Sequence, residues 1–268
     1  MPRPVRVQEL RRKGLLMDLK DMGSAALFGA AGDEPTKRNP EFTDFFTSFA
    51  FVEVPEEVHI PANEANLAVL AALMGAGAVS TFGHMLDVAF AAGVSPLQVR
   101  EMIYQGTAYL GIGRSMPFLE LFDSLRISDE PLEATATVSQ NDRTERGEDA
   151  QVEIFGENMR GFSSRGNEDV RHINRWLSAN CFGDYYTRSG LDLRLRELCT
   201  FCFLAALGGC EPQLTSHAMG NMHIGNDHSY LISVVSALVP YIGYPRCLNA
   251  LECINTAAAN IGIIGKED

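Results

Sequence analysis

The stretch 196–225, RELCTFCFLAALGGCEPQLTSHAMGNMHIG, predicts two helices joined by a tight turn. Its first half is apolar and rich in Ala and Leu, which favours a buried helix over a strand. Gly208 and Gly209 should end this helix, because glycine is a poor helix former and a good C-terminal cap. A second helix should begin near Cys210, with Pro212 in its first turn, where proline is tolerated.

Four polar side chains of this helix pair are candidates for chemistry. Glu197 precedes the turn at Gly209 by slightly more positions than His217 follows it. In a hairpin this mismatch amounts to about 6 Å along the helix axis, which two long side chains can span. We therefore expect Glu197 to orient His217, an arrangement that makes a general acid or base near neutral pH. Cys210 would lie at the helix N-terminus, where a thiol pKa is lowered, and Gln213 would line the same cleft.

The same spacing occurs earlier in the chain. Glu64 precedes His84 by as many positions as Glu197 precedes His217. Further along, the offset between corresponding residues shortens by one, which a single-residue insertion explains. The other residues shared in order are Gly75 with Gly208, Gly93 with Gly225, Tyr109 with Tyr241, Gly111 with Gly243, and Arg114 with Arg246. Such ordered matches indicate an internal repeat.

We therefore predict a chain that is duplicated in tandem. The first copy would be residues 1–126 and the second copy residues 150–268, joined by a polar linker over residues 127–149. The first copy keeps Glu64 and His84 as a possible second site, but Gly77 stands where the second copy has Cys210. It is either a degenerate partner or a site that works without a thiol. Gly32–Asn39 and Gly161–Asn167 should form polar loops.

The composition narrows the classes of function. The chain has 268 residues, of which 46% are hydrophobic, so it can bury a core and is not disordered. Its formal net charge of −12 argues against nucleic-acid partners and against binding to an anionic membrane surface. No apolar stretch is long enough for a membrane span, and no secretory signal is visible, so we expect a cytoplasmic protein.

The six cysteines lie in apolar, helical-looking segments of the second half. In a chain without a secretory signal this pattern favours free thiols over disulfides. Cys199 and Cys202 form a CxxC pair, but no second CxxC or His pair stands at a suitable spacing. We therefore predict no metal site. The acid–base reaction considered below also needs no cofactor.

The pattern of the second copy resembles the carboxymuconolactone decarboxylase family, which includes the AhpD-like alkylhydroperoxidases. The matching residues are Arg196-Glu197, Gly209-Cys210, Gln213-Leu214, His217, Gly225, Tyr241-Ile242-Gly243 and Pro245. The resemblance covers Ile154–Ala257 well and Asn63–Leu121 more weakly. It implies an all-α fold, an AhpD-like helical bundle present twice, and a homo-oligomer such as a trimer of two-copy chains.

The resemblance implies two enzymatic activities. The peroxidase branch of the family carries a second Cys four residues before the His, and Gln213 occupies that position here. This favours a cofactor-independent carboxy-lyase that acts on a small carboxylated lactone or another enolisable acid. His217 would then be the general acid or base and Glu197 its orienting partner. Cys210 and Gln213 would line the pocket.

The remaining expectations concern the substrate and the alternatives. Arg196 or Arg246 would bind the carboxylate of a small anionic substrate. The alternative enzyme is a thiol-dependent hydroperoxide reductase that uses Cys210 as its reactive thiol, since such an enzyme needs an accessible thiolate. A third possibility is an oligomeric binding module without catalytic activity.

Overall fold

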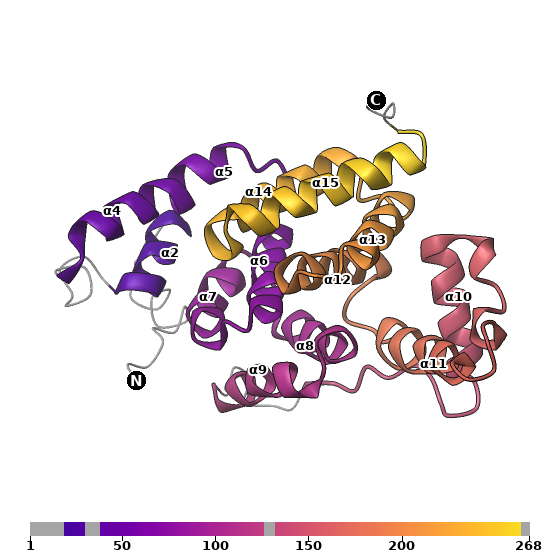
Figure 1. The fold of residues 1–268 in the computed structure, drawn as a ribbon. Coiled ribbons are helices and arrows are strands. Elements are labelled where there is room, and N and C mark those ends of the chain that lie inside the picture. The colour runs from indigo at the N-terminus through magenta and orange to yellow at the C-terminus, as the bar shows by residue number, and fades with distance from the viewer. Residues whose placement is uncertain (1–18, 30–37, 126–131, 264–268) are drawn as a thin grey trace.

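The computed structural model describes residues 19–29, 38–125 and 132–263 (Figure 1). All regular structure in these ranges is helical, which confirms the predicted all-α class. The elements of the first half are α2 (Leu19–Phe28), α4 (Pro40–Ser48), the π-helical η1 (Phe49–Glu53), α5 (Val54–Glu56), α6 (Ala62–Ala76), α7 (Val79–Ala91), α8 (Pro96–Leu110) and α9 (Ile112–Ser124). None of the described helices is long and apolar enough to cross a membrane.

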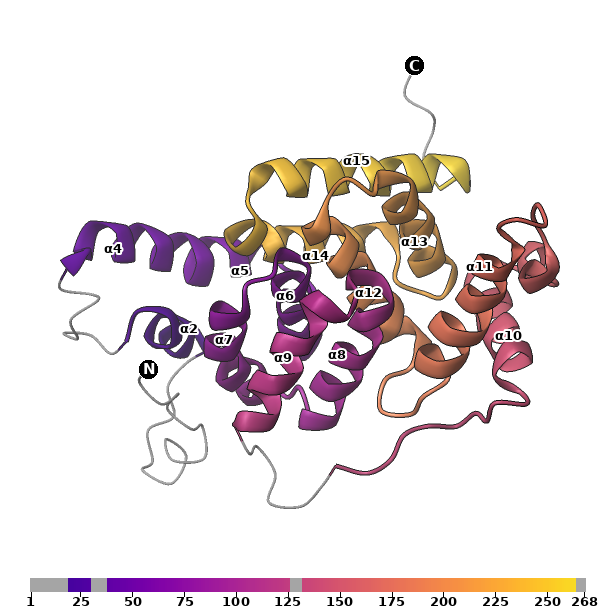
Figure 2. The same cartoon turned by 60° about the horizontal axis from the view of Figure 1, so that its bottom comes forward.

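The second half continues in the same way. Its elements are α10 (Arg143–Phe155), the short 3-10 turns η2 (Glu157–Met159) and η3 (Phe162–Ser164), α11 (Arg171–Trp176), the π-helical η4 (Leu177–Tyr186), α12 (Leu193–Leu207), α13 (Glu211–His223), α14 (His228–Ile242) and α15 (Tyr244–Asn260). Helices α10 and α11 lie at the end of the molecule opposite α4 (Figures 1 and 2).

The predicted helix pair is formed by α12 and α13. Gly208 is the C-cap of α12, and Gly208 and Gly209 have positive φ values of 70° and 71°, a conformation that favours glycine. Cys210 is the N-cap of α13, and Pro212 lies in its first turn. Asp192 caps the start of α12 by accepting a hydrogen bond from Leu195 N. The turn therefore follows from the residues that the sequence places there.

Helix ends recur as the repeat predicts. Helices α8 and α14 have 15 residues each, and both their ends correspond at the offset of the repeat. Ser95 and Asp227 are their N-caps, and each side chain accepts a hydrogen bond from the backbone three residues later. Gly111 and Gly243 are their C-caps, with φ values of 77° and 78°. These matches support a duplication, because unrelated helices would not share both caps and length.

The two halves pack against each other along α6 and α12, which lie side by side in the middle of the molecule (Figures 1 and 2). A Cβ at Gly75 would lie 2.5 Å from the carbonyl oxygen of Phe203, so glycine allows this close approach. One apolar cluster contains buried residues from both helices, such as Leu70 and Leu204. The two halves of the chain therefore share one core.

The predicted linker, 127–149, is shorter in the structure. Residues 132–139 contain no helix, but α10 begins at Arg143. The linker prediction is wrong for this last part. Its many charged residues suggest a solvated segment, but the segment forms a helix with one face packed on η4. Gly147 lies on that face, where an added Cβ would lie 1.9 Å from the carbonyl oxygen of Ser178.

The two predicted polar loops can be compared only in part. The loop expected at Gly32–Asn39 lies mostly outside the described residues. The loop expected at Gly161–Asn167 contains the turn η3. The preceding turn η2, and not this loop, joins α10 in lining the cavity described below.

Candidate active site

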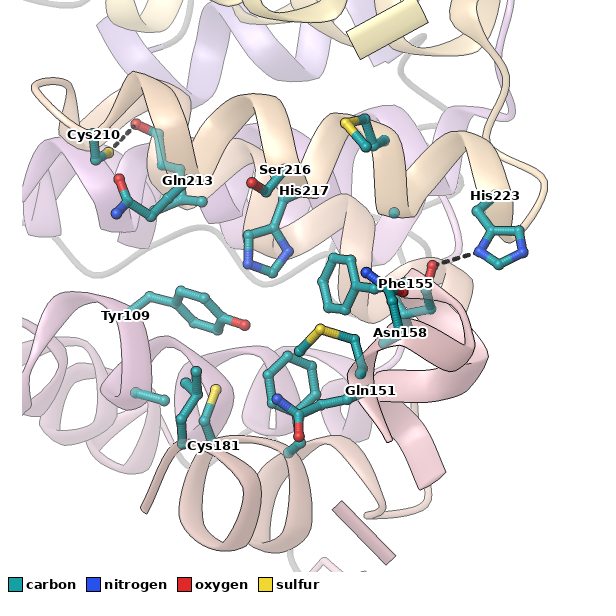
Figure 3. A pocket seen from close by; sticks show the side chains of 18 of the residues that line it. Tyr109, Gln151, Phe155, Asn158, Cys181, Cys210, Gln213, Ser216, His217 and His223 are labelled. Carbon is teal, nitrogen blue, oxygen red and sulfur yellow. Dashed lines mark hydrogen bonds between the residues drawn. The ribbon is translucent and has the colours of Figure 1, made fainter. Parts of the chain in front are cut away.

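A cavity of about 850 Å³ lies between α10, η4, α13 and the ends of α8 and α12 (Figure 3). Its wall is mostly apolar and carries a few polar side chains, which is typical of a small-molecule site. The lining residues are Ala108, Tyr109, Gln151, Ile154, Phe155, Asn158, Met159, Leu177, Cys181, Phe182, Leu204, Leu207, Cys210, Gln213, Ser216, His217, Met219, Gly220, His223 and Ile261.

The predicted pairing of Glu197 with His217 is present. His217 Nδ1 lies 2.8 Å from Glu197 Oε2, and the carboxylate is fully buried behind the imidazole. A carboxylate only accepts hydrogen bonds, so Nδ1 carries the proton in this contact. The neutral imidazole then has its lone pair on Nε2. His217 lines the cavity and can present that nitrogen to a ligand.

The other carboxylate oxygen of Glu197 is held by a tyrosine. Tyr186 OH donates to Glu197 Oε1 at 2.7 Å and lies 2.6 Å from Thr200 Oγ1 and 2.8 Å from Tyr109 OH. Because Tyr186 has one proton and gives it to Glu197, the other two hydroxyls donate to its oxygen. Tyr109 comes from α8 of the first half. The hydrogen-bond network around Glu197 therefore draws on both halves of the chain.

Aromatic rings fix the plane of the imidazole. Tyr109 and Phe155 both meet the ring of His217 edge to face, with centroid distances of 5.5 Å and 5.4 Å. Figure 3 shows these two rings flanking His217 on the cavity wall. A ring that is packed on both sides and bonded through Nδ1 has little freedom to rotate, so Nε2 keeps a fixed direction.

Gly220 and Asn221 allow helix α13 to pack closely on α12 and α10. A Cβ at Gly220 would lie 2.8 Å from Phe155 Cε1 and 3.1 Å from Glu197 Oε2. Asn221 Nδ2 donates to the backbone carbonyl oxygens of Glu197 and His217, at 3.0 and 2.8 Å. These contacts set the spacing that lets the carboxylate reach the imidazole.

Cys210 and Gln213 line the same cavity, as expected. The expectation that Cys210 has a lowered pKa is wrong. Burial raises the pKa of the Cys210 thiol, the Glu211 carboxylate raises it further, and the opposing effect of Arg246 is smaller. All six cysteines are free thiols. Desolvation of the sulfur is the largest of these effects.

The two arginines that we expected to bind a substrate carboxylate do not line the cavity. Arg196 is fully buried and bonds Glu101 and Gln105 on the far side of α12. Neighbouring helical residues point about 100° apart, so Arg196 and Glu197 cannot face the same cavity. Arg246 lines a small separate hollow that it shares with Cys210.

The possible second site is arranged differently. Glu64 bonds Arg194 and Tyr230 of the second half instead of His84. Burial raises the pKa of Glu64, but the hydrogen bonds from Arg194 and Tyr230 outweigh it and leave the pKa lowered. A second cavity of about 480 Å³ contains Tyr241, but neither Glu64 nor His84 lines it. This favours the degenerate interpretation of the first copy.

Sequence reasoning missed several residues of the site. Tyr109, Tyr186, Gln151, Cys181 and His223 were not assigned to it, yet four of them line the cavity and Tyr186 holds Glu197. The match between Tyr109 and Tyr241 was the one available signal. Gln151, Cys181 and Tyr186 lie on helices whose packing the sequence does not reveal, whereas His223 ends the predicted helix α13.

His223 and Cys181 have defined surroundings in the cavity wall. His223 Nδ1 donates to the carbonyl oxygen of Ile154 at 2.8 Å, which leaves Nε2 for other contacts. Burial raises the pKa of the Cys181 thiol to about 12, so it stays protonated near neutral pH. Within the described ranges no three His, Cys, Asp or Glu side chains gather closely enough to hold a metal ion.

Comparisons with known proteins concern the second half of the chain and the overall fold. Residues 172–256 match the model of the carboxymuconolactone decarboxylase family. The fold is similar to a crystal structure from Burkholderia xenovorans LB400, of a protein provisionally assigned as a gamma-carboxymuconolactone decarboxylase subunit. That likeness has a TM-score of 0.52 and 17% sequence identity, and it covers 92% of this chain and 99% of the other. No curated protein sequence matches the chain significantly.

Proposed function

We propose that this chain, whose second half matches the carboxymuconolactone decarboxylase family, is an enzyme that uses His217 as a general acid and base. One observation carries the proposal. His217 forms part of the wall of a mostly apolar cavity, and its Nδ1 is held at 2.8 Å by the buried carboxylate of Glu197. A buried carboxylate that orients an imidazole supports proton transfer at the opposite ring nitrogen.

The reaction would take place at a carbon next to a carbonyl group. In a carboxylated lactone, the bond to the carboxylate carbon breaks, CO₂ leaves, and the electron pair passes through the conjugated system onto the carbonyl oxygen. The resulting enolate then takes a proton from Nε2–H of the His217 imidazolium. In a related enolisable compound, Nε2 first removes a proton from the carbon, and the same enolate forms. Decarboxylation takes up one proton from solvent per turnover, which restores the His217 imidazolium, whereas the exchange route returns the proton that it removed.

The other residues would support this step by position. Glu197 keeps the proton on Nδ1 and stabilises the imidazolium, and Tyr186 holds the second carboxylate oxygen. Gln213 lies on the same helix as His217, and Cys210 is the N-cap of that helix. Both line the cavity and offer polar contacts to a ligand. Their neutral groups can bind without taking part in the proton transfer.

A thiol-dependent hydroperoxide reductase is the alternative, because Cys210 lines the cavity together with His217. The raised pKa of Cys210 disfavours its thiolate, and Gln213 stands where the peroxidase branch has its second Cys. Peroxide treatment followed by sulfenic-acid trapping and mass spectrometry tests this alternative. It requires Cys210 to be oxidised and peroxide turnover to depend on an added thiol.

We also propose a homo-oligomer, with a trimer of two-copy chains as the expected form. Large apolar side chains are exposed on α4 and α15, among them Phe45 at 63% and Leu248 at 61%. Such side chains are usually covered in an assembly. Light scattering coupled to gel filtration gives the mass directly, and a monomer would contradict this proposal.

The experiment for the enzyme compares the wild type with His217→Ala on a panel of enolisable carbonyl compounds that includes 4-carboxymuconolactone. CO₂ release reports decarboxylation, and deuterium uptake from D₂O, followed by NMR, reports proton exchange beside the carbonyl. We expect at least one compound to react with the wild type and to react at the background rate with His217→Ala. Equal rates for the two proteins would refute the proposal.

A further inference from the structure

The cavity wall contains a buried amide group whose donor has no partner. Gln151 of α10 is fully buried, and its Oε1 accepts a hydrogen bond from Ser178 Oγ at 2.6 Å. Its Nε2 makes no hydrogen bond, although the residue lines the cavity. Figure 3 shows Gln151 and His217 on opposite sides of the cavity. A buried N–H group without a partner is costly, so an acceptor on a ligand would stabilise it.

The cavity wall also lacks permanently charged side chains among its described residues. No Lys, Arg, Asp or Glu occurs among the described residues that line it. Burial raises the pKa values of Tyr109 and Cys181, so both remain protonated. The carboxylate of Glu197 lies directly behind His217. An anionic group in this cavity would lose its water, and no Lys or Arg lines the wall to pair with it, which is unfavourable.

The size and lining of the cavity indicate the size and polarity of the rest of the ligand. About 850 Å³ is at the upper end of the range for small-molecule pockets. Ile154, Phe155, Leu177, Phe182 and Met219 supply a broad apolar surface. A ligand that fills this space would have an apolar body, such as fused rings, in addition to its hydrogen-bonding group.

We propose that the cavity binds an uncharged, largely apolar carbonyl compound, whose carbonyl oxygen accepts a hydrogen bond from Gln151 Nε2. This deepens the proposed function, on which its chemical part rests, and selects its proton-exchange route over decarboxylation of an anionic substrate. When His217 Nε2 removes a proton from the neighbouring carbon, the C–H electron pair forms the new C–C double bond. The carbonyl pair moves to oxygen, where the N–H of Gln151 stabilises the enolate. Return of the proton completes the exchange.

The test measures the binding of two ligands with the same ring system by calorimetry at pH 7.5. 2-Acetylnaphthalene is an uncharged ketone, and 2-naphthoate is an anion of similar size. We expect saturable binding of the ketone to the wild type, and binding of the naphthoate at least tenfold weaker. Gln151→Leu should weaken ketone binding about fivefold to tenfold, the usual effect of losing one hydrogen bond. 2-Ethylnaphthalene, which lacks the oxygen, should not respond to this substitution.

Each result decides one part of the proposal. Naphthoate binding as tight as ketone binding would overturn the uncharged class, and so would the absence of saturable ketone binding. Unchanged ketone affinity in Gln151→Leu would overturn the hydrogen bond. If Gln151→Leu does not fold, Gln151→Glu retains an acceptor for Ser178 and should also weaken ketone binding. Because binding is measured without turnover, tight ketone binding without His217-dependent exchange would refute only the proposed function.

Discussion

His217 Nδ1 and Glu197 Oε2 lie 2.8 Å apart, although the two residues belong to different helices and are separated by 20 positions in the chain. The contact joins the middle of α13 to the first half of α12. It is buried on the Glu197 side and open to a cavity on the His217 side. This one-sided burial orients the imidazole and leaves its second nitrogen for chemistry.

Glu197→Gln tests the orienting role of the carboxylate. The side-chain amide that this substitution introduces can donate a hydrogen bond to Nδ1 of His217. This favours the tautomer whose proton is on Nε2, and in that tautomer Nε2 cannot act as a base. We expect kcat/KM to fall about 10²-fold to 10⁴-fold, as when other orienting carboxylates are replaced. Steady-state kinetics and circular dichroism measure activity and folding. Glu153→Gln, on the exposed face of α10, is the matched control and should keep wild-type activity.

Gly220→Ala tests the close packing of α13 on its neighbours. The added methyl group would meet Phe155 Cε1 at 2.8 Å and Glu197 Oε2 at 3.1 Å, so the ring and the carboxylate must move. We expect a loss of about 1–3 kcal/mol in unfolding free energy and a clear loss of activity. Gly113→Ala, in open space on α9, should be neutral or slightly stabilising. Equal denaturation midpoints for the two variants would contradict this account.

The reactivity of Cys210 tests the effect of desolvation on its thiol. Burial and the neighbouring Glu211 raise the pKa of Cys210, so its thiolate fraction is low at pH 7 and grows as the pH rises. Alkylation by iodoacetamide should therefore be slower than for a small free thiol at pH 7. It should accelerate about tenfold per pH unit up to pH 9. Peptide mapping by mass spectrometry gives the rate at this residue. Fast, pH-independent labelling between pH 6 and 7 would show an activated thiolate.

Glu101 provides a prediction for stability against pH. Burial raises the pKa of Glu101, but the hydrogen bonds from Arg188 and Thr135 outweigh it, and the pKa is lowered in the folded chain. A carboxyl group whose pKa is lowered by folding stabilises the fold at pH values above its pKa in the unfolded chain, which is about 4.3 for Glu. This stability is lost as the pH falls through the folded value. Wild-type stability should therefore drop more steeply below pH 4.5 than that of Glu101→Gln.

Glu101→Gln should also lower the stability of the fold at neutral pH. Glu101 faces the fully buried guanidinium of Arg196 at 3.3 Å, and its removal leaves that charge without its partner. We expect Glu101→Gln to lose about 3–5 kcal/mol in unfolding free energy at pH 7. Urea denaturation at several pH values measures both effects. Parallel pH profiles for the two proteins would refute the role of Glu101.

Local sequence signals predicted the α12–α13 hairpin and the contact between Glu197 and His217. The paired glycines, the proline in the first turn and the helical rise define the geometry within one hairpin, so no long-range information is needed. The same holds for the matched caps of α8 and α14, because Ser95, Asp227 and the cap glycines act on adjacent backbone.

Features that depend on long-range packing were not predicted. Tyr109 reaches the site from the other half of the chain, and Gln151 lies on a helix whose first half was predicted to be linker. Arg196 was expected to bind a substrate carboxylate, but its side chain points toward Glu101. The pKa of Cys210 depends on desolvation, which a sequence pattern does not report.

The central claim is that His217, and not Cys210, carries out the chemistry. The most direct test measures kcat/KM for His217→Ala and Cys210→Ser side by side, on a carbonyl compound that the wild type turns over. The account predicts that His217→Ala reacts at the background rate and that Cys210→Ser stays within about tenfold of the wild type. Background activity in Cys210→Ser together with near wild-type activity in His217→Ala would contradict it.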